Sequence, residues 1–176
     1  HVIRNLEYFP YKVIQIETCE ADDIIATVVH DIEGSQLLNG SEMIMILSGD
    51  KDFIQLHKYK NVSQYSPITK RMINGTNSEE YLKEHILKGD ASDGIPNVLS
   101  PDHTFTEKLR QRPLGKKKIE SFKENGLPTE EIKRNYQRNE KLINLSLSPD
   151  DLYITILKEY QEAPEGDRSK LLNYFI

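Results

Sequence analysis

The chain has 176 residues, of which 37% are hydrophobic and 29% are charged, and this suits one compact unit or two small ones. No apolar run approaches the roughly 18 residues of a membrane span and no signal-like stretch opens the chain, so we expect a soluble cytoplasmic protein without a membrane partner. Cys19 is the only cysteine, which excludes an intrachain disulfide and favours a reducing compartment. The chain begins with His1 rather than Met, and we expect it to be part of a longer protein.

The formal net charge of -5 argues at first against a nucleic-acid partner, but the charges are unevenly distributed. Four acids and no base lie between Glu17 and Asp23, whereas seven bases and two acids lie between Glu107 and Lys123. An acidic group and a basic group in one chain suit a metal site next to a phosphate-binding surface. Two ordinary solvated faces would have the same composition, so charge alone does not decide between these interpretations.

The first part of the chain predicts an α/β unit. The β-branched run Tyr11–Ile16 has strand length, and Ala21–Gly34 has the apolar stripe of a helix with acids in its first turn. The polar residues Ser35–Ser41 predict a loop, and the continuous apolar run Met43–Leu47 predicts a strand buried on both faces. Strand, helix and strand make a βαβ unit, whose strands should be parallel with a right-handed crossover.

The composition becomes helical near residue 76, after a predicted helix that begins at Asp52 and an extended pair around Ser66-Pro67. The predicted helices of the second half cover 78–89, with Ser78 as N-cap and Gly89 at the end, and then 115–126, 128–146 and 150–161. We therefore expect two domains. Residues 1–75 form an α/β domain with a partial parallel sheet flanked by helices, and residues 76–176 form an all-helical subdomain.

Acidic residues directly follow both predicted parallel strands. Glu20, Asp22 and Asp23 follow the first strand, and Asp50 and Asp52 follow the second. Loops after parallel strands lie on one edge of the sheet, so the two groups should meet in space. Converging carboxylates repel each other unless cations or protons neutralise them, and oxygen ligands without a nearby histidine or cysteine pair suit Mg²⁺ or Mn²⁺. Two such ions about 4 Å apart can clamp the oxygens of a phosphodiester displacement.

Helix capping is the simpler explanation for some of these acids. Acids in the first turn of a helix interact with the helix dipole, which contributes roughly a few tenths of a kcal/mol and would account for Asp22 or Asp23 alone. Capping explains Glu20 poorly and does not explain SGDKD after a buried strand, so metal-assisted phosphoester hydrolysis is favoured. A third acidic pair, Asp90 and Asp93, lies just past a predicted helix end, although turns that contain Asp and Gly are common.

Three segments in order resemble the downstream acidic motifs of the 5′-nuclease or flap endonuclease family, most closely its ribonuclease H branch from T-even-like phages. They are EADD (Glu20–Asp23), SGDKDFIQL (Ser48–Leu56) and KGDASDGIPNV (Lys88–Val98). The segments HKYKNVSQYSP (His57–Pro67) and RNEKLINLS (Arg138–Ser146) extend the likeness, which runs from about residue 7 to the end of the chain.

The resemblance implies a set of site residues and a cofactor. The catalytic residues, which would hold the more tightly bound metal, are Glu20, Asp22, Asp50 and Asp52. Asp23 would assist them, and Asp90 and Asp93 would hold a second metal. The implied cofactor is a pair of Mg²⁺ ions, for which Mn²⁺ can substitute.

The resemblance also implies a fold and an activity. The fold is a PIN-like, 5′-nuclease sheet followed by a helical subdomain whose helix-three-turn-helix motif grips duplex DNA. The activity is 5′→3′ removal of RNA primers or DNA 5′ ends from nicked or flapped duplexes during replication, in the host-cell cytoplasm if the protein is encoded by a phage. The suggested partners are a single-strand-binding protein and a sliding clamp, although no clamp motif is visible.

Gly115, Lys116, Lys117 and Lys118 open one of the predicted helices. Free N–H groups at a helix start, together with three lysines, make a phosphate site. A solvated lysine-rich face is the commoner role of an isolated run of three lysines. The position of this run within the family's helical motif favours DNA binding.

The chain departs from the family's pattern in two respects. Gly94 stands where Asn is usual, Asn97 stands near the usual Gly, and a long loop (Leu99–Leu114) precedes the lysines, which puts the monovalent-ion site of some members in question. The family's further acids and its basic helical arch lie upstream of EADD, and this chain has neither, so it should be inactive or nearly so alone. A non-catalytic, nuclease-like DNA-binding module is therefore an alternative, while the helical half argues against a small single-stranded-RNA nuclease.

Overall fold

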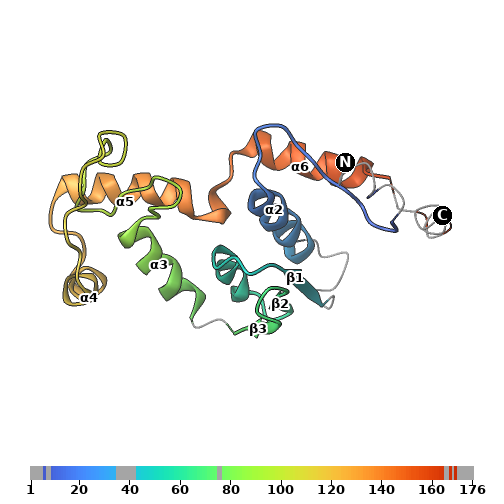
Figure 1. The fold of residues 1–176 in the computed structure, drawn as a ribbon, viewed down its shortest axis with the longest axis horizontal. Coiled ribbons are helices and arrows are strands. Elements are labelled where there is room, and N and C mark those ends of the chain that lie inside the picture. The colour runs from blue at the N-terminus through green and yellow to red at the C-terminus, as the bar shows by residue number, and fades with distance from the viewer. Residues whose placement is uncertain are drawn as a thin grey trace. The chain divides into compact units, whose positions relative to one another are not determined.

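A computed structural model of the protein describes residues 9–34, 43–74 and 77–164, together with Leu6, Asp167 and Ser169 (Figure 1). The chain divides into two compact units. Unit 1 comprises His1–Ser35 and Ser148–Ile176, and unit 2 comprises Gln36–Leu147. The loop predicted for residues 35–41 lies outside the described residues, and the domain division expected at residues 75 and 76 stays a prediction. None of the described helices is long and apolar enough to cross a membrane.

Unit 1 contains two helices that contact each other, α2 (Ala21–Gly34) and α6 (Asp150–Glu162). Their buried residues include Ala26, Val29 and Ile156. The pattern of apolar residues thus predicts both helices correctly, including the end of α2 at Gly34.

The predicted strand Tyr11–Ile16 is not formed, and the predicted βαβ unit is therefore wrong. A strand needs a neighbouring strand to take up its backbone hydrogen bonds, and none of the described strands pairs with residues 12–16. Val13 is 36% exposed. Lys12 connects this segment to α6 instead, because its Nζ donates to the carbonyl of Tyr160 at 3.0 Å and lies 5.0 Å from the centre of the Tyr160 ring.

The first part of unit 2 is a mixed sheet in the order β1-β2-β3. Its strands are β1 (Ile44–Leu47), β2 (Val62–Ser66) and β3 (Arg71–Ile73). β1 runs parallel to β2 and β2 runs antiparallel to β3, so the predicted extended pair around Ser66-Pro67 is confirmed. The crossover from β1 to β2 contains the 3₁₀ helix η2 (Asp52–Lys58), where the sequence predicts a helix.

β1 is covered on one face only. Ile46 is 5% exposed, whereas Met45 is 58% and Leu47 is 66% exposed. Successive side chains of a strand point to opposite faces, so the exposed and buried residues of β1 alternate. The expectation that this strand is buried on both faces is therefore wrong.

The second part of unit 2 is helical. It contains α3 (Ser78–Lys88), α4 (Lys116–Asn125), α5 (Glu130–Ile143) and the 3₁₀ turn η3 (Leu145–Leu147). The N-cap of α3 is Asn77 rather than the predicted Ser78, because the Asn77 side chain accepts hydrogen bonds from the N–H groups of Glu79 and Glu80. Since α3 contacts both α5 and η2, it joins the helical part of unit 2 to its sheet (Figure 1).

Two hydrophobic clusters surround α3. One contains Ile86, Ile95 and Ile143, and the other contains Leu87, Val98 and Ile119. The two neighbouring residues at the end of α3 thus point into different clusters. The observed α/β part followed by packed helices confirms the expected fold class.

Two buried asparagines of α5 hold the chain after α3. Asn139 Nδ2 donates to the carbonyls of Ile86 at 2.8 Å and Pro96 at 2.9 Å. Asn135, one turn earlier, donates to the carbonyl of Val98 at 3.0 Å. Each bond satisfies a buried carbonyl group that would otherwise lack a partner, at a cost of about 1–3 kcal/mol.

The C-terminal end of α5 is held by Gln55 of η2. The Gln55 amide nitrogen donates to the carbonyl of Ile143 at 2.9 Å, and its amide oxygen accepts from the N–H of Leu145 at 3.1 Å. Both bonds are buried, so this single side chain fixes η2 to the last turn of α5.

Two glycines end α3 and α4 in nearly the same backbone conformation. Gly89 has φ 67° and ψ -177°, and Gly126 has φ 79° and ψ 179°. A Cβ atom at Gly89 would lie 2.4 Å from the carbonyl oxygen of Ile95, whereas a Cβ atom at Gly126 would have nothing within 4 Å.

We expect Gly89→Ala to lower the free energy of unfolding more than Gly126→Ala does. Both substitutions cost about 1–3 kcal/mol for a backbone region that only glycine adopts readily. The clash with the Ile95 carbonyl adds overpacking of about 1–3 kcal/mol for Gly89→Ala alone. Urea unfolding followed by circular dichroism measures both losses, and equal values would contradict the close approach at Gly89.

Candidate metal centre

Asp50 and Asp52 lie in a tight turn between β1 and η2. The Asp50 carboxylate accepts a hydrogen bond from the N–H of Asp52, and the Asp50 N–H donates to Ser48 Oγ, both at 3.1 Å. Gln64, which is fully buried in β2, donates from its amide nitrogen to the carbonyls of Ser48 at 2.9 Å and Asp50 at 2.5 Å. The neighbouring parallel strand thus fixes the turn that bears both carboxylates.

Asp90 and Asp93 lie in the turn that follows Gly89 and the end of α3. The Asp90 carboxylate accepts from the N–H of Ser92 at 2.8 Å and from the Ser92 hydroxyl. The Ile95 N–H donates to the Asp90 carbonyl at 2.6 Å, which closes the turn. The bond from the Ser92 hydroxyl is the main reason why the pKa of Asp90 is lowered.

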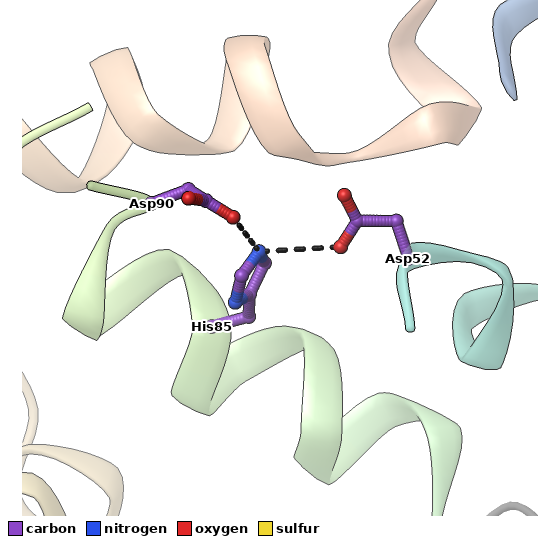
Figure 2. A group of neighbouring side chains, drawn as sticks. All are labelled: Asp52, His85 and Asp90. Carbon is purple, nitrogen blue, oxygen red and sulfur yellow. Dashed lines mark ion pairs between the residues drawn. The ribbon is translucent and has the colours of Figure 1, made fainter. Parts of the chain in front are cut away.

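His85 of α3 lies between the two acidic turns (Figure 2). Its Nε2 atom is 3.3 Å from Asp52 Oδ1 and 3.6 Å from Asp90 Oδ2, and its side chain is 17% exposed. Interaction with Asp52 is the largest cause that raises the pKa of His85, and burial acts against it. Geometrically, however, both contacts are ion pairs, because Nε2 makes no well-directed hydrogen bond. The ring stacks on Tyr81 with the ring centres 5.7 Å apart.

Two neighbouring groups show that negative charge is concentrated at this place. Burial, and after it the charges of Asp52, Asp50 and Asp90, raises the pKa of Tyr81 to about 12. Burial, and after it Asp90, Asp52 and Asp50, raises the pKa of Asp93. Asp50, Asp52, Asp90 and Asp93 therefore act on one another, and together they form what we call the acidic cluster.

The acidic cluster and His85 offer ligands for a metal ion. One ligand atom each of Asp52, His85 and Asp90 lies within 4.8 Å of the others. Carboxylates at this density need a cation, since their mutual repulsion otherwise drives protonation. Carboxylate oxygens are suitable ligands for hard divalent cations, so the donor set fits a divalent ion.

Glu20, Asp22 and Asp23 lie at the start of α2 in unit 1. The Asp23 carboxylate accepts from the N–H of Glu20 at 3.4 Å, as a capping residue does. Burial, and then Asp23, Asp22 and Glu20, raises the pKa of the Cys19 thiol. These acids belong to unit 1 and the acidic cluster belongs to unit 2, so their expected convergence stays a prediction.

The predicted phosphate-binding residues lie at the start of α4. Gly115 is the N-cap, without a side-chain hydrogen bond, and the first turn of the helix contains no acid. Lys116, Lys117 and Lys118 are all exposed. The structure thus presents three lysines to solvent at a helix start, and their role stays a prediction.

Sequence reasoning missed His85, since it assumed that no histidine lies near the acids. A signal exists in the sequence, because EHILKGD places this histidine on the last turns of a helix just before Asp90. The contact with Asp52, however, depends on the packing of α3 against η2, which the sequence pattern does not reveal.

Residues 1–87 match the family described as 5′-3′ exonuclease, N-terminal resolvase-like domain, and residues 76–176 match T4 RNase H, C terminal. The chain is 34% identical to Ribonuclease H of Enterobacteria phage T4 over 181 residues, which cover 96% of this chain and 57% of that protein. It is 35% identical over 95 residues to the 5′-3′ exonuclease of Buchnera aphidicola subsp. Acyrthosiphon pisum (strain APS), covering 49% of this chain and 31% of that protein. The chain thus spans 57% and 31% of the lengths of these two relatives.

The fold is similar to that of the T5 D15 protein, whose crystal structure was obtained by co-crystallisation with metal ions. The TM-score is 0.59 at 19% identity, covering 85% of this chain and 61% of that chain, and this likeness concerns the fold alone. It agrees with the predicted 5′-nuclease-like architecture. Since residues 76–176 make up more than half of the chain, the two matches together show that it belongs to the 5′-3′ exonuclease family, with a C-terminal part of the T4 RNase H type.

Proposed function

We propose that the full-length protein is a structure-dependent, divalent-metal 5′→3′ nuclease that removes RNA primers or DNA 5′ ends from duplexes during replication. The supporting observation is the acidic cluster, which two separate turns build around His85 in a member of the exonuclease family. Because the chain spans 57% of its phage T4 relative, the activity is proposed for the full-length protein. The chain alone is expected to be inactive or nearly so.

The proposal gives the acids separate tasks. One Mg²⁺ ion would be held by Glu20, Asp22, Asp50 and Asp52, with help from Asp23. A second would be held by Asp90 and Asp93, and Mn²⁺ would substitute for either. Divalent ions bound there would activate the attacking water and stabilise charge on the phosphodiester oxygens.

The protein's own contribution is to hold the carboxylates in place before substrate binds. Gln64 fixes the carbonyl groups of the turn that bears Asp50, and Ser92 fixes the Asp90 carboxylate. A carboxylate that is already held by a neighbouring donor loses less freedom when a cation binds. This preorganisation supports a catalytic site rather than a group of solvated acids.

The substrate in this proposal is a duplex with a 5′ end or flap, and Lys116, Lys117 and Lys118 would bind its phosphates. Such contacts position a duplex without reading its sequence. A single-strand-binding protein and a sliding clamp are further proposed partners, and the host-cell cytoplasm is the proposed place of action. The non-catalytic DNA-binding alternative predicts the same lysine contacts without any cleavage.

We expect Asp50→Asn in the full-length protein to abolish cleavage in Mg²⁺ while duplex binding survives. Asn keeps the side-chain oxygen that accepts from the Asp52 N–H, so the turn should persist while the negative charge is lost. The loss should be roughly 100-fold or more, the upper range even for residues that only support a metal ligand. Cleavage of a flapped duplex, with Glu107→Gln as the control acid, measures it. Near-normal turnover of Asp50→Asn would show that the site is misassigned.

We expect Lys117→Ala to weaken duplex binding about equally for all sequences. Each lost phosphate contact should lower the slope of log K against log salt by about 0.9, because fewer counterions are released. Lys133→Ala is the matched control, since Lys133 is an exposed lysine that pairs with Glu130 at 2.8 Å. Unchanged slopes for Lys116→Ala, Lys117→Ala and Lys118→Ala would leave these residues as a solvated face.

A further inference from the structure

The distances around His85 are those of ligands that share one ion. Its Nε2 atom lies 3.3 Å from Asp52 Oδ1 and 3.6 Å from Asp90 Oδ2. Two ligand atoms that bind a cation at about 2.0–2.2 Å with a tetrahedral angle between them are about 3.4 Å apart. Nitrogen and both oxygens therefore fit around a common centre without rearrangement of the backbone.

The orientation of the ring supports the same arrangement. Nε2 is buried, yet it makes no well-directed hydrogen bond, although carboxylate oxygens of Asp52 and Asp90 lie within 3.6 Å. A histidine that only neutralises an acid points its N–H directly at one oxygen. Here the axis of the ring nitrogen is directed at neither oxygen, as expected for a lone pair aimed at an ion that the three groups hold together.

Each of the three ligands is positioned by a different part of unit 2. The His85 ring is stacked on Tyr81 within α3. Gln64 of β2 holds the turn that leads to Asp52, and Ser92 holds the carboxylate of Asp90. The ligand set is therefore preformed, which favours tight binding of an ion that matches its donors.

We propose that Asp52, His85 and Asp90 form a mixed nitrogen and oxygen site that selects a transition-metal dication, of the Zn²⁺ or Co²⁺ kind, over Mg²⁺. Imidazole is a good ligand for such ions, whereas Mg²⁺ prefers oxygen ligands and retains several waters. This inference rests on the part of the proposed function that assigns metal binding to the acidic cluster. It adds that His85 is the residue that determines which metal binds most tightly.

Titration calorimetry of the chain with Zn²⁺ and separately with Mg²⁺ tests this assignment, at about pH 8, where a histidine ligand is free of its proton. His85→Gln should weaken Zn²⁺ binding by roughly tenfold or more, the loss that even a residue supporting a metal ligand causes. Binding of Mg²⁺ should change much less. His103→Gln is the matched control, because the exposed His103 also lies near an acid, with its Nε2 3.9 Å from Glu107 Oε2, and it should leave both affinities unchanged.

The wild-type chain provides a second measurement that does not depend on the stability of a variant. In the ¹⁵N spectrum of histidine side chains, assigned through their own backbone resonances, Zn²⁺ should shift Nε2 of His85 selectively. Equal losses for Zn²⁺ and Mg²⁺ in His85→Gln, or Zn²⁺ binding without that shift, would overturn the role of His85 and leave the proposed nuclease function standing. A wild-type chain that binds neither ion would overturn both.

Discussion

The mutual repulsion of four carboxylates is opposed in unit 2 by buried side-chain amides that bind backbone groups. Gln64 clamps the turn of Asp50, and Gln55 fixes η2 to the end of α5. Asn139 fixes the end of α3 and the loop beyond it. An amide that lost its buried partner would leave a polar group unsatisfied at a cost of about 1–3 kcal/mol. These bonds therefore resist displacement of either acidic turn, which like charges would otherwise push apart.

α5 is the common reference for both turns. Asn139 binds the loop that follows Asp90, and one helical turn later the carbonyl of Ile143 accepts from Gln55 of the segment that follows Asp52. Two segments that are far apart in the sequence are thus anchored on adjacent turns of one helix. The position of α3 between them explains why His85 meets both acids.

Sequence periodicity and glycine positions were sufficient to predict the helices of both units, including the ends of α3 and α4 at Gly89 and Gly126. The strand proposed at Tyr11–Ile16 failed, because strand propensity does not supply a pairing partner. Asn135 and Asn139 could not be recognised either, since polar residues on a helix normally indicate its solvated face. Both are instead fully buried, because their amides serve the loop beside them.

A net charge of -5 is compatible with a phosphate-binding surface, because the two ends of α4 treat their lysines differently. Lys123 near the C-terminal end is 14% exposed and pairs with Glu80, Glu84 and Glu120, so its charge is neutralised within the protein. The first turn of α4 contains three exposed lysines, of which Lys117 is one, and no acid. Salt screens exposed charges over about 8 Å at physiological ionic strength, so an approaching phosphate responds to these lysines more than to acids elsewhere. The local arrangement of charge, rather than the total, therefore decides whether this surface attracts a nucleic acid.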